Sequence, residues 1–292
     1  MALVQIVFSD FLHYRAVCRP LAKLPLIGTQ IYLSLFFLPN FFINYPYLSP
    51  NNCVMRVVIR CCLFTVLLAA AATAAAQTSQ MYYKDGSDKF MTGDYRGAIE
   101  AFTKAIGMEP AYTDAWYFRG MTKFIMKDST AADDFSKTVG LDPNRVKAWA
   151  YRGMARYRRK EYSSAIADFS RAISLKPDYE EAWFYRGNSN MELKNYFSAI
   201  TDLDKAIALK PDYTAAIYTR GVARFMMQKY AEALPDLDRT IALNPTYSGK
   251  TWYFRGICRI RLNQKDMACP DFKKAAELGV ADAAEMRKKY CQ

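Results

Sequence analysis

The sequence predicts an all-α fold in which pairs of helices stack into a solenoid. From Ser79 onward the chain repeats itself about every 34 residues, and five prolines mark that period at spacings of 33, 34, 34 and 34. These are Pro110, Pro143, Pro177, Pro211 and Pro245. Between the prolines, apolar and small residues recur at helical spacing in two runs separated by a short turn. The proline then ends the second run, because it has no amide hydrogen for the helix.

In the fourth copy, for example, the first run is 181–194 and the second is 197–209. A glycine lies 24 residues before the proline in full-length copies, a bulky residue lies four before that glycine, and an alanine lies 12 before the proline. The glycines are Gly86, Gly153, Gly187 and Gly221, the bulky residues Tyr82, Trp116, Trp149, Trp183 and Ile217, and the alanines Ala98, Ala165, Ala199 and Ala233. Glycine and alanine at facing positions let the two helices of a copy approach closely, so each copy predicts a helix hairpin.

This pattern resembles the W-x2-L-G-x2-Y…A-x3-F…P signature of the tetratricopeptide repeat, or TPR. The resemblance covers residues 79–292 in six copies. It implies a right-handed α-solenoid of about six TPR hairpins, in which stacked neighbours bury a continuous core. A last helix within 280–291 then resembles the capping helix of such arrays. The resemblance names a scaffold and no particular partner.

Residues 55–76 have the features of a secretory signal peptide. Arg56 and Arg60 form a short positive region, an apolar stretch follows, and Ala74 and Ala76 are the small residues of a cleavage site. Cleavage there predicts an exported chain. The Arg-Gly pair and the AxDF motif of the repeats, with the cysteine-bearing cap, resemble bacterial members of the family, which implies a periplasmic or outer-membrane-associated protein.

The mature TPR array is then expected over residues 77–292. An uncleaved membrane anchor is the alternative, but the apolar segment 61–76 has 16 residues, fewer than the roughly 20 that a spanning helix needs. Residues 1–54 share nothing with the repeats, and we interpret them as a non-native extension before a start at Met55. A genuine membrane-proximal extension is the alternative, and membrane anchoring follows if residues 1–76 are retained.

The composition argues against several classes of function. The formal net charge is +12, and beyond residue 76 it is 35 − 27 = +8, spread along all the repeats without a basic tail. We therefore expect no nucleic-acid partner. The single histidine, His13, lies before the expected mature chain, and the chain shows no nucleophile–base pair, metal-ligand set or phosphate loop. We expect no enzyme activity, no metal, no cofactor and no small-molecule substrate.

An arginine precedes the glycine position in copies two to six, and an aspartate lies one residue before the Phe or Leu of the second run. The arginines are Arg119, Arg152, Arg186, Arg220 and Arg255, and the aspartates Asp134, Asp168, Asp202, Asp236 and Asp271. The first copy lacks both, with Asp85 and Ala101 instead. Because the two residues are present or absent together, we interpret them as structural ion pairs. An anion-binding row of arginines is the alternative.

Two cysteines lie near the C-terminal end of the array. Cys269 lies near the start of the sixth second run and Cys291 at the end of the cap, so antiparallel helices bring them together. In an exported protein this geometry favours a disulfide. Cys258 is then the odd cysteine, and we interpret it as a buried apolar residue.

In TPR arrays the first helices line the concave face, so the resemblance implies a partner-binding surface there. The residues expected on it are Tyr83, Tyr117, Met121, Met154, Phe184, Asn188, Tyr218, Val222 and Tyr253. Such a groove has the composition of a protein-interaction surface. The lysine–asparagine clamp of chaperone-tail binders is represented only by Asn188. Two charged pairs in copies three and four, Lys147 with Glu181 and Arg158 with Glu192, are interpreted as ion pairs between repeats.

The function that follows is a non-catalytic scaffold that binds a protein or peptide partner on the concave face. The alternative is a structural subunit of a cell-envelope assembly that uses convex or terminal surfaces.

Overall fold

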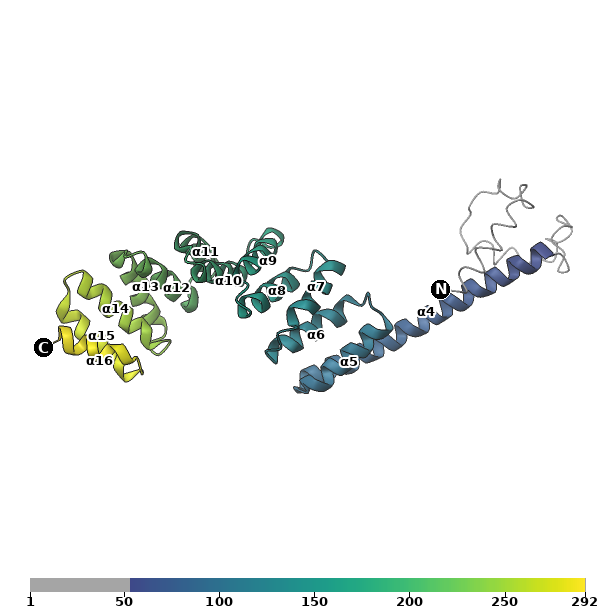
Figure 1. Ribbon diagram of the computed structural model, residues 1–292, viewed down its shortest axis with the longest axis horizontal. Helices are drawn as coiled ribbons and strands as arrows, with labels where there is room; N and C mark the ends of the chain where they lie inside the picture. The colour runs from purple at the N-terminus through teal and green to yellow at the C-terminus, as the bar shows by residue number, and fades with distance from the viewer. Residues whose placement is uncertain (1–52, 292) are drawn as a thin grey trace. The chain divides into compact units, whose positions relative to one another are not determined.

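The computed structural model describes residues 53–291, and within them the chain forms helices joined by short turns, without a strand (Figure 1). The chain divides into two units, Met1–Ala72 and Thr73–Gln292. Helix α4 (Cys53–Thr92) continues from the first unit into the second. The expected extension 1–54 lies almost entirely outside the described residues. Of the helices that are described, none combines the length and the apolar character that a membrane span requires.

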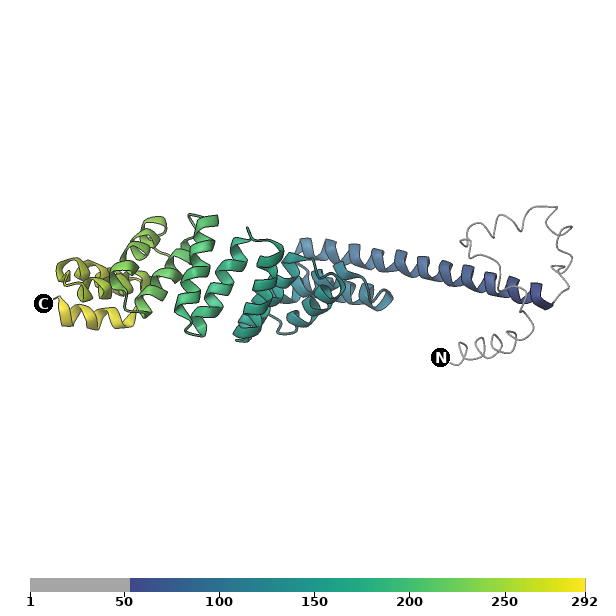
Figure 2. The same ribbon diagram turned by 90° about the horizontal axis from the view of Figure 1, so that it is seen from above.

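The second unit is a row of helix hairpins closed by one further helix (Figures 1 and 2). The hairpins are α4 with α5 (Tyr95–Met108), α6 (Thr113–Ile125) with α7 (Ala131–Leu141), α8 (Val146–Arg158) with α9 (Tyr162–Leu175), α10 (Glu180–Glu192) with α11 (Tyr196–Leu209), α12 (Thr214–Met226) with α13 (Tyr230–Leu243), and α14 (Gly249–Arg261) with α15 (Lys265–Glu277). The last helix is α16 (Ala281–Tyr290). The predicted solenoid of six hairpins and a capping helix is confirmed.

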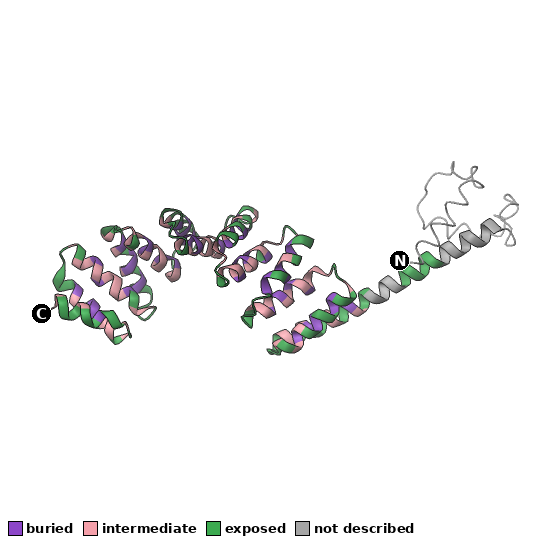
Figure 3. Ribbon diagram, in the orientation of Figure 1, coloured by how far each residue is buried: buried purple, intermediate pink, exposed green. Residues whose placement is uncertain are grey.

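Close packing within each hairpin explains the repeated glycine. A Cβ atom added at Gly153 would lie 2.8 Å from the ring of Phe169, and one at Gly256 would lie 2.7 Å from the ring of Phe272. The Phe or Leu of every second helix is fully buried against this glycine. These residues are Phe102, Phe135, Phe169, Leu203, Leu237 and Phe272. The same small-to-large contact therefore recurs in every hairpin, and Figure 3 shows buried residues on the helices along the array.

The turn inside each hairpin uses the left-handed backbone conformation. The residue seven positions after the repeat glycine has a φ between 60° and 83° in all six copies. These residues are Gly93, Lys127, Lys160, Lys194, Gln228 and Asn263. Glycine enters this region without steric cost, whereas the lysines and glutamine enter it against their preference.

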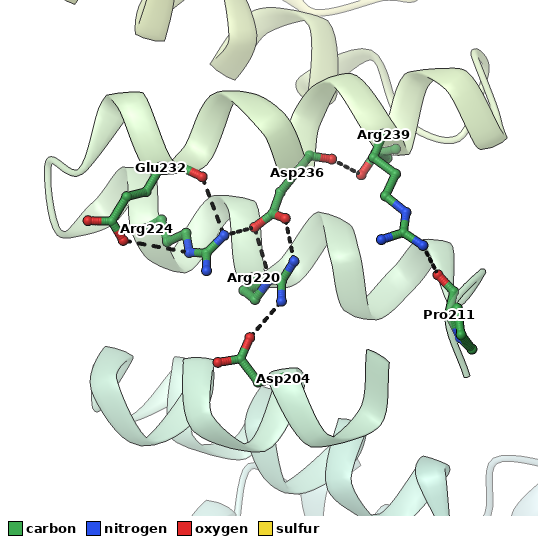
Figure 4. Close-up of polar contacts among 8 residues, drawn as sticks. Asp204, Pro211, Arg220, Arg224, Glu232, Asp236 and Arg239 are labelled. Atoms are coloured by element: carbon green, nitrogen blue, oxygen red, sulfur yellow. Dashed lines mark hydrogen bonds and ion pairs between the residues drawn. The ribbon is translucent and has the colours of Figure 1, made fainter. Parts of the chain in front are cut away.

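The turn between hairpins is held by a tryptophan that reaches back to the proline. The indole Nε1 of Trp183 donates to the carbonyl of Pro177 at 2.8 Å. The same bond, at 2.9 Å, joins Trp116 to Pro110, Trp149 to Pro143 and Trp252 to Pro245. In the fifth copy Ile217 replaces the tryptophan, and the Arg239 guanidinium donates to Pro211 instead, at 2.6 Å (Figure 4).

The curvature of the array places the first helices on its inner side. Consecutive first helices contact one another directly from α6 to α14, and consecutive second helices have fewer contacts than these. A stack whose first helices are the closer set curves around them. The inner surface is therefore made from α4, α6, α8, α10, α12 and α14.

Candidate functional site

We use the name inner face for the solvent-facing stripe of the first helices. It consists of side chains six and three residues before the repeat glycine and one and five residues after it, which share one side of a helix. The predicted contact residues belong to this stripe, and eight of the nine are partly exposed. They are Tyr83, Met121, Met154, Phe184, Asn188, Tyr218, Val222 and Tyr253.

Tyr117 is the exception, because it is mostly buried. Only 8% of it is exposed. Its ring packs edge-on against Phe118, Phe135 and Tyr151, at centroid distances of 5.3, 6.1 and 6.2 Å. The Arg145 guanidinium lies 5.0 Å from the ring centroid on the next repeat. Tyr117 is therefore a core residue beneath the inner face, where it supports the joint between repeats.

The exposed rings pack on residues that the sequence analysis did not select. Phe184 lies 4.8 Å from Tyr213, and Tyr218 lies 5.4 Å from Tyr247, measured between ring centroids. Tyr83 lies 5.0 Å from Tyr112 in the same way. Each of these partners is the second residue after a repeat proline, so the Pro-x-Tyr spacing was the available signal. The inner face is thus a double row of aromatic rings in repeats one, four and five.

Two hollows lie on this face near its N-terminal end. One, of about 330 Å³, is lined by Asp114, Tyr117, Phe118, Arg145, Val146 and Lys147. The other, of about 550 Å³, is lined by Gln77, Gln80, Met81, Tyr83, Lys84, Ser87 and Tyr112. In both hollows aromatic rings lie beside polar and charged side chains.

The inner tyrosines stay protonated at neutral pH. Burial raises the pKa of Tyr117 to about 12, and burial together with the Glu192 carboxylate raises the pKa of Tyr157 to about 12. Burial also raises the pKa of Tyr179 and Tyr213, and the nearby Glu181 carboxylate adds to the rise. These hydroxyls are therefore available as hydrogen-bond donors and do not add negative charge to the surface.

The expected ion pairs between repeats three and four are not formed. Among the described residues, neither Lys147 nor Glu181 takes part in an ion pair, and Arg158 does not contact Glu192. Arg158 instead lies 3.5 Å over the ring of Phe124 and donates to its carbonyl at 2.7 Å. Because these groups are exposed, water competes with each pairing, and little free energy holds a surface pair together.

The arginine and aspartate rows meet inside the hairpins, as contacts of 2.6 to 2.7 Å between a guanidinium nitrogen and a carboxylate oxygen. The pairs are Arg119–Asp134, Arg152–Asp168, Arg186–Asp202, Arg220–Asp236 and Arg255–Asp271. Both Nε and a terminal nitrogen bind the carboxylate in every pair, which is the bidentate geometry that arginine favours. The aspartates are buried, so the arginines do not form a free anion-binding row.

Each of these aspartate carboxylates also accepts a contact from a second side chain. In repeats two, three, five and six it is a cation one helical turn after the arginine, and in repeat four it is the amide of Asn190. These cations are Lys123, Arg156, Arg224 and Arg259. Even so, burial raises the pKa of Asp271, and the hydrogen bond and charge of Arg255 oppose that rise.

The remaining guanidinium nitrogen reaches back to the preceding repeat. Arg220 donates to Asp204 at 2.6 Å (Figure 4). Arg255 donates to Asp238 at 2.7 Å in the same way. In repeats two to four the acceptor is a hydroxyl, on Thr103, Ser136 or Ser170. Each arginine therefore joins the two helices of its own hairpin to the second helix before it. We call this series of contacts the arginine ladder.

Comparison with known proteins identifies the repeat. Three models of the tetratricopeptide repeat match the chain, over residues 83–122, 153–194 and 180–213. The chain contains tetratricopeptide repeats. No curated protein matches it at a significant level.

Solved TPR structures resemble the array. A MamA crystal structure is 25% identical, with a TM-score of 0.56, and the match covers 58% of this chain and 93% of MamA. YrrB, described as a TPR protein with an unusual peptide-binding site, is 20% identical with a TM-score of 0.57 and coverage of 66% and 100%. PilF of Pseudomonas aeruginosa is 15% identical with a TM-score of 0.62 and coverage of 74% and 99%. The last two likenesses concern the fold alone.

The TPR array ends in a cap with few apolar contacts of its own. Within α16, Ala283 is buried and most other residues are exposed. Cys269 on α15 and Cys291 after α16 lie at disulfide geometry, with Cα atoms 5.7 Å apart. Cys258 is fully buried in the hairpin of repeat six, and burial raises the pKa of its thiol to about 12. That thiol therefore stays protonated and unreactive in the folded protein.

Within residues 53–291, no cluster of three metal-binding side chains occurs. TPR proteins in general are non-catalytic scaffolds, and the site that this array offers is the aromatic inner face.

Proposed function

We propose that this protein is a non-catalytic scaffold that binds an extended segment of a protein partner along the inner face. The observation that carries the proposal is the double row of aromatic rings on the inner face in repeats one, four and five. Rings such as Phe184 and Tyr218 are held in place by Tyr213 and Tyr247, so they lose little conformational freedom when a partner covers them. YrrB, which shares the fold, is described as having a peptide-binding site, in keeping with this use of the fold.

A segment that crosses several repeats buries aromatic area from each of them. Large aromatic side chains dominate most protein interfaces, and truncation of one such anchor costs on the order of 2 kcal/mol. The protonated tyrosine hydroxyls add donors for the partner's backbone carbonyls. The proposal therefore predicts binding that depends on several rings at once and extends over the array.

The test is the double substitution Phe184→Ala with Tyr218→Ala. We expect partner capture from an envelope extract to fall at least tenfold, while circular dichroism still reports a folded helical protein. Phe197→Ala is the matched control, because this ring is 77% exposed on the second helix α11 and away from the inner face. Normal capture by the folded double variant would show that the partner uses convex or terminal surfaces, as a structural subunit would.

We propose in addition that the chain is exported and loses its signal segment before Gln77. Residues 64–70 and Ala76 are exposed along α4, whereas Ser79 is fully buried and donates to Glu109 at 2.7 Å. Among the residues whose burial is described, packing of the array thus begins just after the proposed cleavage site. N-terminal sequencing of protein recovered from cells should give Gln77 first. A retained segment before Gln77 would contradict the proposal and favour an anchor.

Export also predicts an oxidised cap. Thiol counting on the mature protein should find Cys258 as its one free thiol, and that thiol should react with iodoacetamide only after unfolding. Opening the bond by reduction should destabilise the cap by up to about 3 kcal/mol, since it closes a loop of 22 residues in sequence separation. Three free thiols in extracytoplasmic material would contradict the disulfide.

A further inference from the structure

The charged side chains of the inner face follow one order along the array. Two positions carry them, six residues before the repeat glycine and five residues after it, at the two edges of the aromatic rows. Repeat three has Lys147 and Arg158 at these positions, repeat four has Glu181 and Glu192, repeat five has Ala215 and Met226, and repeat six has Lys250 and Arg261. In repeats three to six the two edges thus agree in sign: positive, negative, neutral and positive.

These charges are not neutralised within the described part of the protein. None of the six charged residues takes part in an ion pair there, and five of them are exposed, with Glu181 partly exposed. The contrast with repeat two is clear, because Asp114 at the same position is bound by Arg145 and contributes little free charge. Glu192 receives a long hydrogen bond, of 3.4 Å, from the Tyr157 hydroxyl, which leaves its charge in place.

We propose that the inner face selects an extended polypeptide segment of complementary charge order: acidic, basic, apolar and acidic, matched to repeats three to six. The proposal rests on the function proposed above and adds the chemistry of the partner. Packed helices lie about 8–10 Å apart, and an extended chain advances roughly 3.3 Å per residue. Successive elements of the partner's pattern are therefore about three residues apart.

Electrostatic complementarity of this kind acts on specificity. A segment with the opposite charge at each position places like charges against repeats three, four and six. This repulsion lowers its affinity relative to the matched segment. The aromatic rows supply sequence-tolerant affinity, and the charges set the direction and position of the segment. Because the charges are at the edges of the face, the preference should weaken at high salt.

The test uses defined fluorescein-labelled peptides with the intact array. One peptide carries Glu, Arg, Leu and Glu at steps of about three residues among apolar and aromatic residues, and a second carries the reverse order for the other chain direction. A third has Arg for each Glu and Glu for Arg, and a fourth has Gln at every charged position. We expect one of the first two to bind at least tenfold more tightly than the third and fourth in low salt.

Two double variants of the protein assign the effect to the inner face. Glu181→Lys with Glu192→Lys should weaken the preferred peptide at least tenfold and strengthen its variant with Glu in place of Arg. Glu100→Lys with Asp133→Lys changes the net charge equally on the second helices α5 and α7, where both carboxylates are exposed, and should leave binding unchanged.

Each other outcome counts against the charge order. Equal losses in both double variants would mean that net charge alone attracts the peptide. No preference among the four peptides, in variants that fold by circular dichroism, would show that the order is not recognised. The capture test with Phe184→Ala and Tyr218→Ala is independent of these peptides, so the proposed function can survive a failure of this inference.

Discussion

The first repeat and the five that follow share one backbone arrangement but not the same polar contacts. Repeat one has Asp85 where the others have arginine, Ala101 where they have the buried aspartate, and Tyr82 where most have tryptophan. Asp85 faces solvent and pairs with Lys89 one turn along its own helix. Ala101 is 2% exposed and needs no partner. The hairpin of repeat one therefore forms without the arginine ladder and without an indole bond to a proline.

The missing contacts have one property in common: in the later repeats they reach back to the preceding hairpin. The arginine gives one nitrogen to the previous second helix, and the tryptophan gives its N–H to the previous proline carbonyl. Repeat one has no repeat before it in the array. The difference teaches that these polar groups join each hairpin to the one before it, and that the glycine–phenylalanine contact is enough to form a hairpin without them.

The largest expected effect comes from placing half of the ladder in repeat one. Ala101→Asp puts a carboxylate at a buried position without an arginine, and we expect a loss of about 3 kcal/mol of unfolding free energy. Adding Asp85→Arg supplies the partner and should recover at least about 1 kcal/mol of that loss. Urea denaturation followed by circular dichroism measures both, and Asp85→Arg alone completes the cycle.

A recovery would separate the contact within a hairpin from the contact between hairpins, because repeat one offers only the first. If Asp85→Arg restores nothing in the Ala101→Asp background, the bidentate pair has no stabilising role apart from the preceding helix. If Ala101→Asp alone leaves the free energy of unfolding unchanged, water reaches this position more than its burial indicates. The comparison between repeat one and the later repeats would then lose its basis.

A smaller loss is expected when the ladder is interrupted in the middle of the array. Arg186→Ala removes the bidentate contact to Asp202 and the contact to Ser170, but Asp202 keeps the amide of Asn190 at 3.1 Å. We expect a loss of about 2 kcal/mol in the urea experiment, with partner capture unchanged. The control Arg171→Ala, at an exposed arginine outside any ion pair, should stay within about 0.5 kcal/mol of the parent. A selective loss of capture in a stable Arg186→Ala protein would assign the arginine to binding instead.

The hairpins and the arginine–aspartate pairs could be predicted because the sequence repeats them. Joint presence in five copies and joint absence in one is a pattern that side chains in contact produce. The indole bond to the proline was not predicted, because its acceptor is a backbone carbonyl that every residue has. The role of Arg239 is less visible still, since the proline carbonyl that it binds belongs to a turn 28 residues earlier.

The inner face shows where a family pattern stops being informative. Tyr117 occupies the same repeat position as Phe184 and Tyr218, yet it is buried, because Arg145 lies over its ring and Tyr151 packs edge-on against it. Lys147 and Glu181 occupy equivalent positions on neighbouring helices, and equivalent positions point in the same direction. Water solvates exposed charges there as well as a partner of opposite charge would. The ion pairs that we predicted from adjacent positions therefore do not form.

The tryptophan bond distinguishes repeat four from repeat five. Trp183→Phe keeps most of the ring but removes the N–H that binds Pro177, and we expect a loss of about 1 kcal/mol of unfolding free energy. In repeat five Arg239→Ala removes an exposed donor to Pro211, and there the loss should be below about 0.5 kcal/mol, because water can replace it. Equal losses in Trp183→Phe and Arg239→Ala would mean that the proline carbonyl needs a donor, whichever side chain supplies it. In that case the arginine is a full substitute for the indole.

The smallest effect concerns the turn inside the hairpin, where repeat one has the residue that suits the backbone best. Gly93 has a φ of 83°, whereas Lys194 holds a φ of 60° that a residue with a Cβ adopts at a cost. Lys194→Gly should therefore stabilise the array by about 0.5 kcal/mol, the relief of strain being partly offset by the larger freedom of glycine in the unfolded chain. Gly93→Lys should destabilise it by a similar amount. Opposite shifts of the urea midpoint in the two variants would show that the turn acts within one hairpin, independently of the preceding repeat. If both variants shift the urea midpoint in the same direction, the lysine side chain makes a stabilising contact of its own. The turn would then also differ between repeat one and the later repeats.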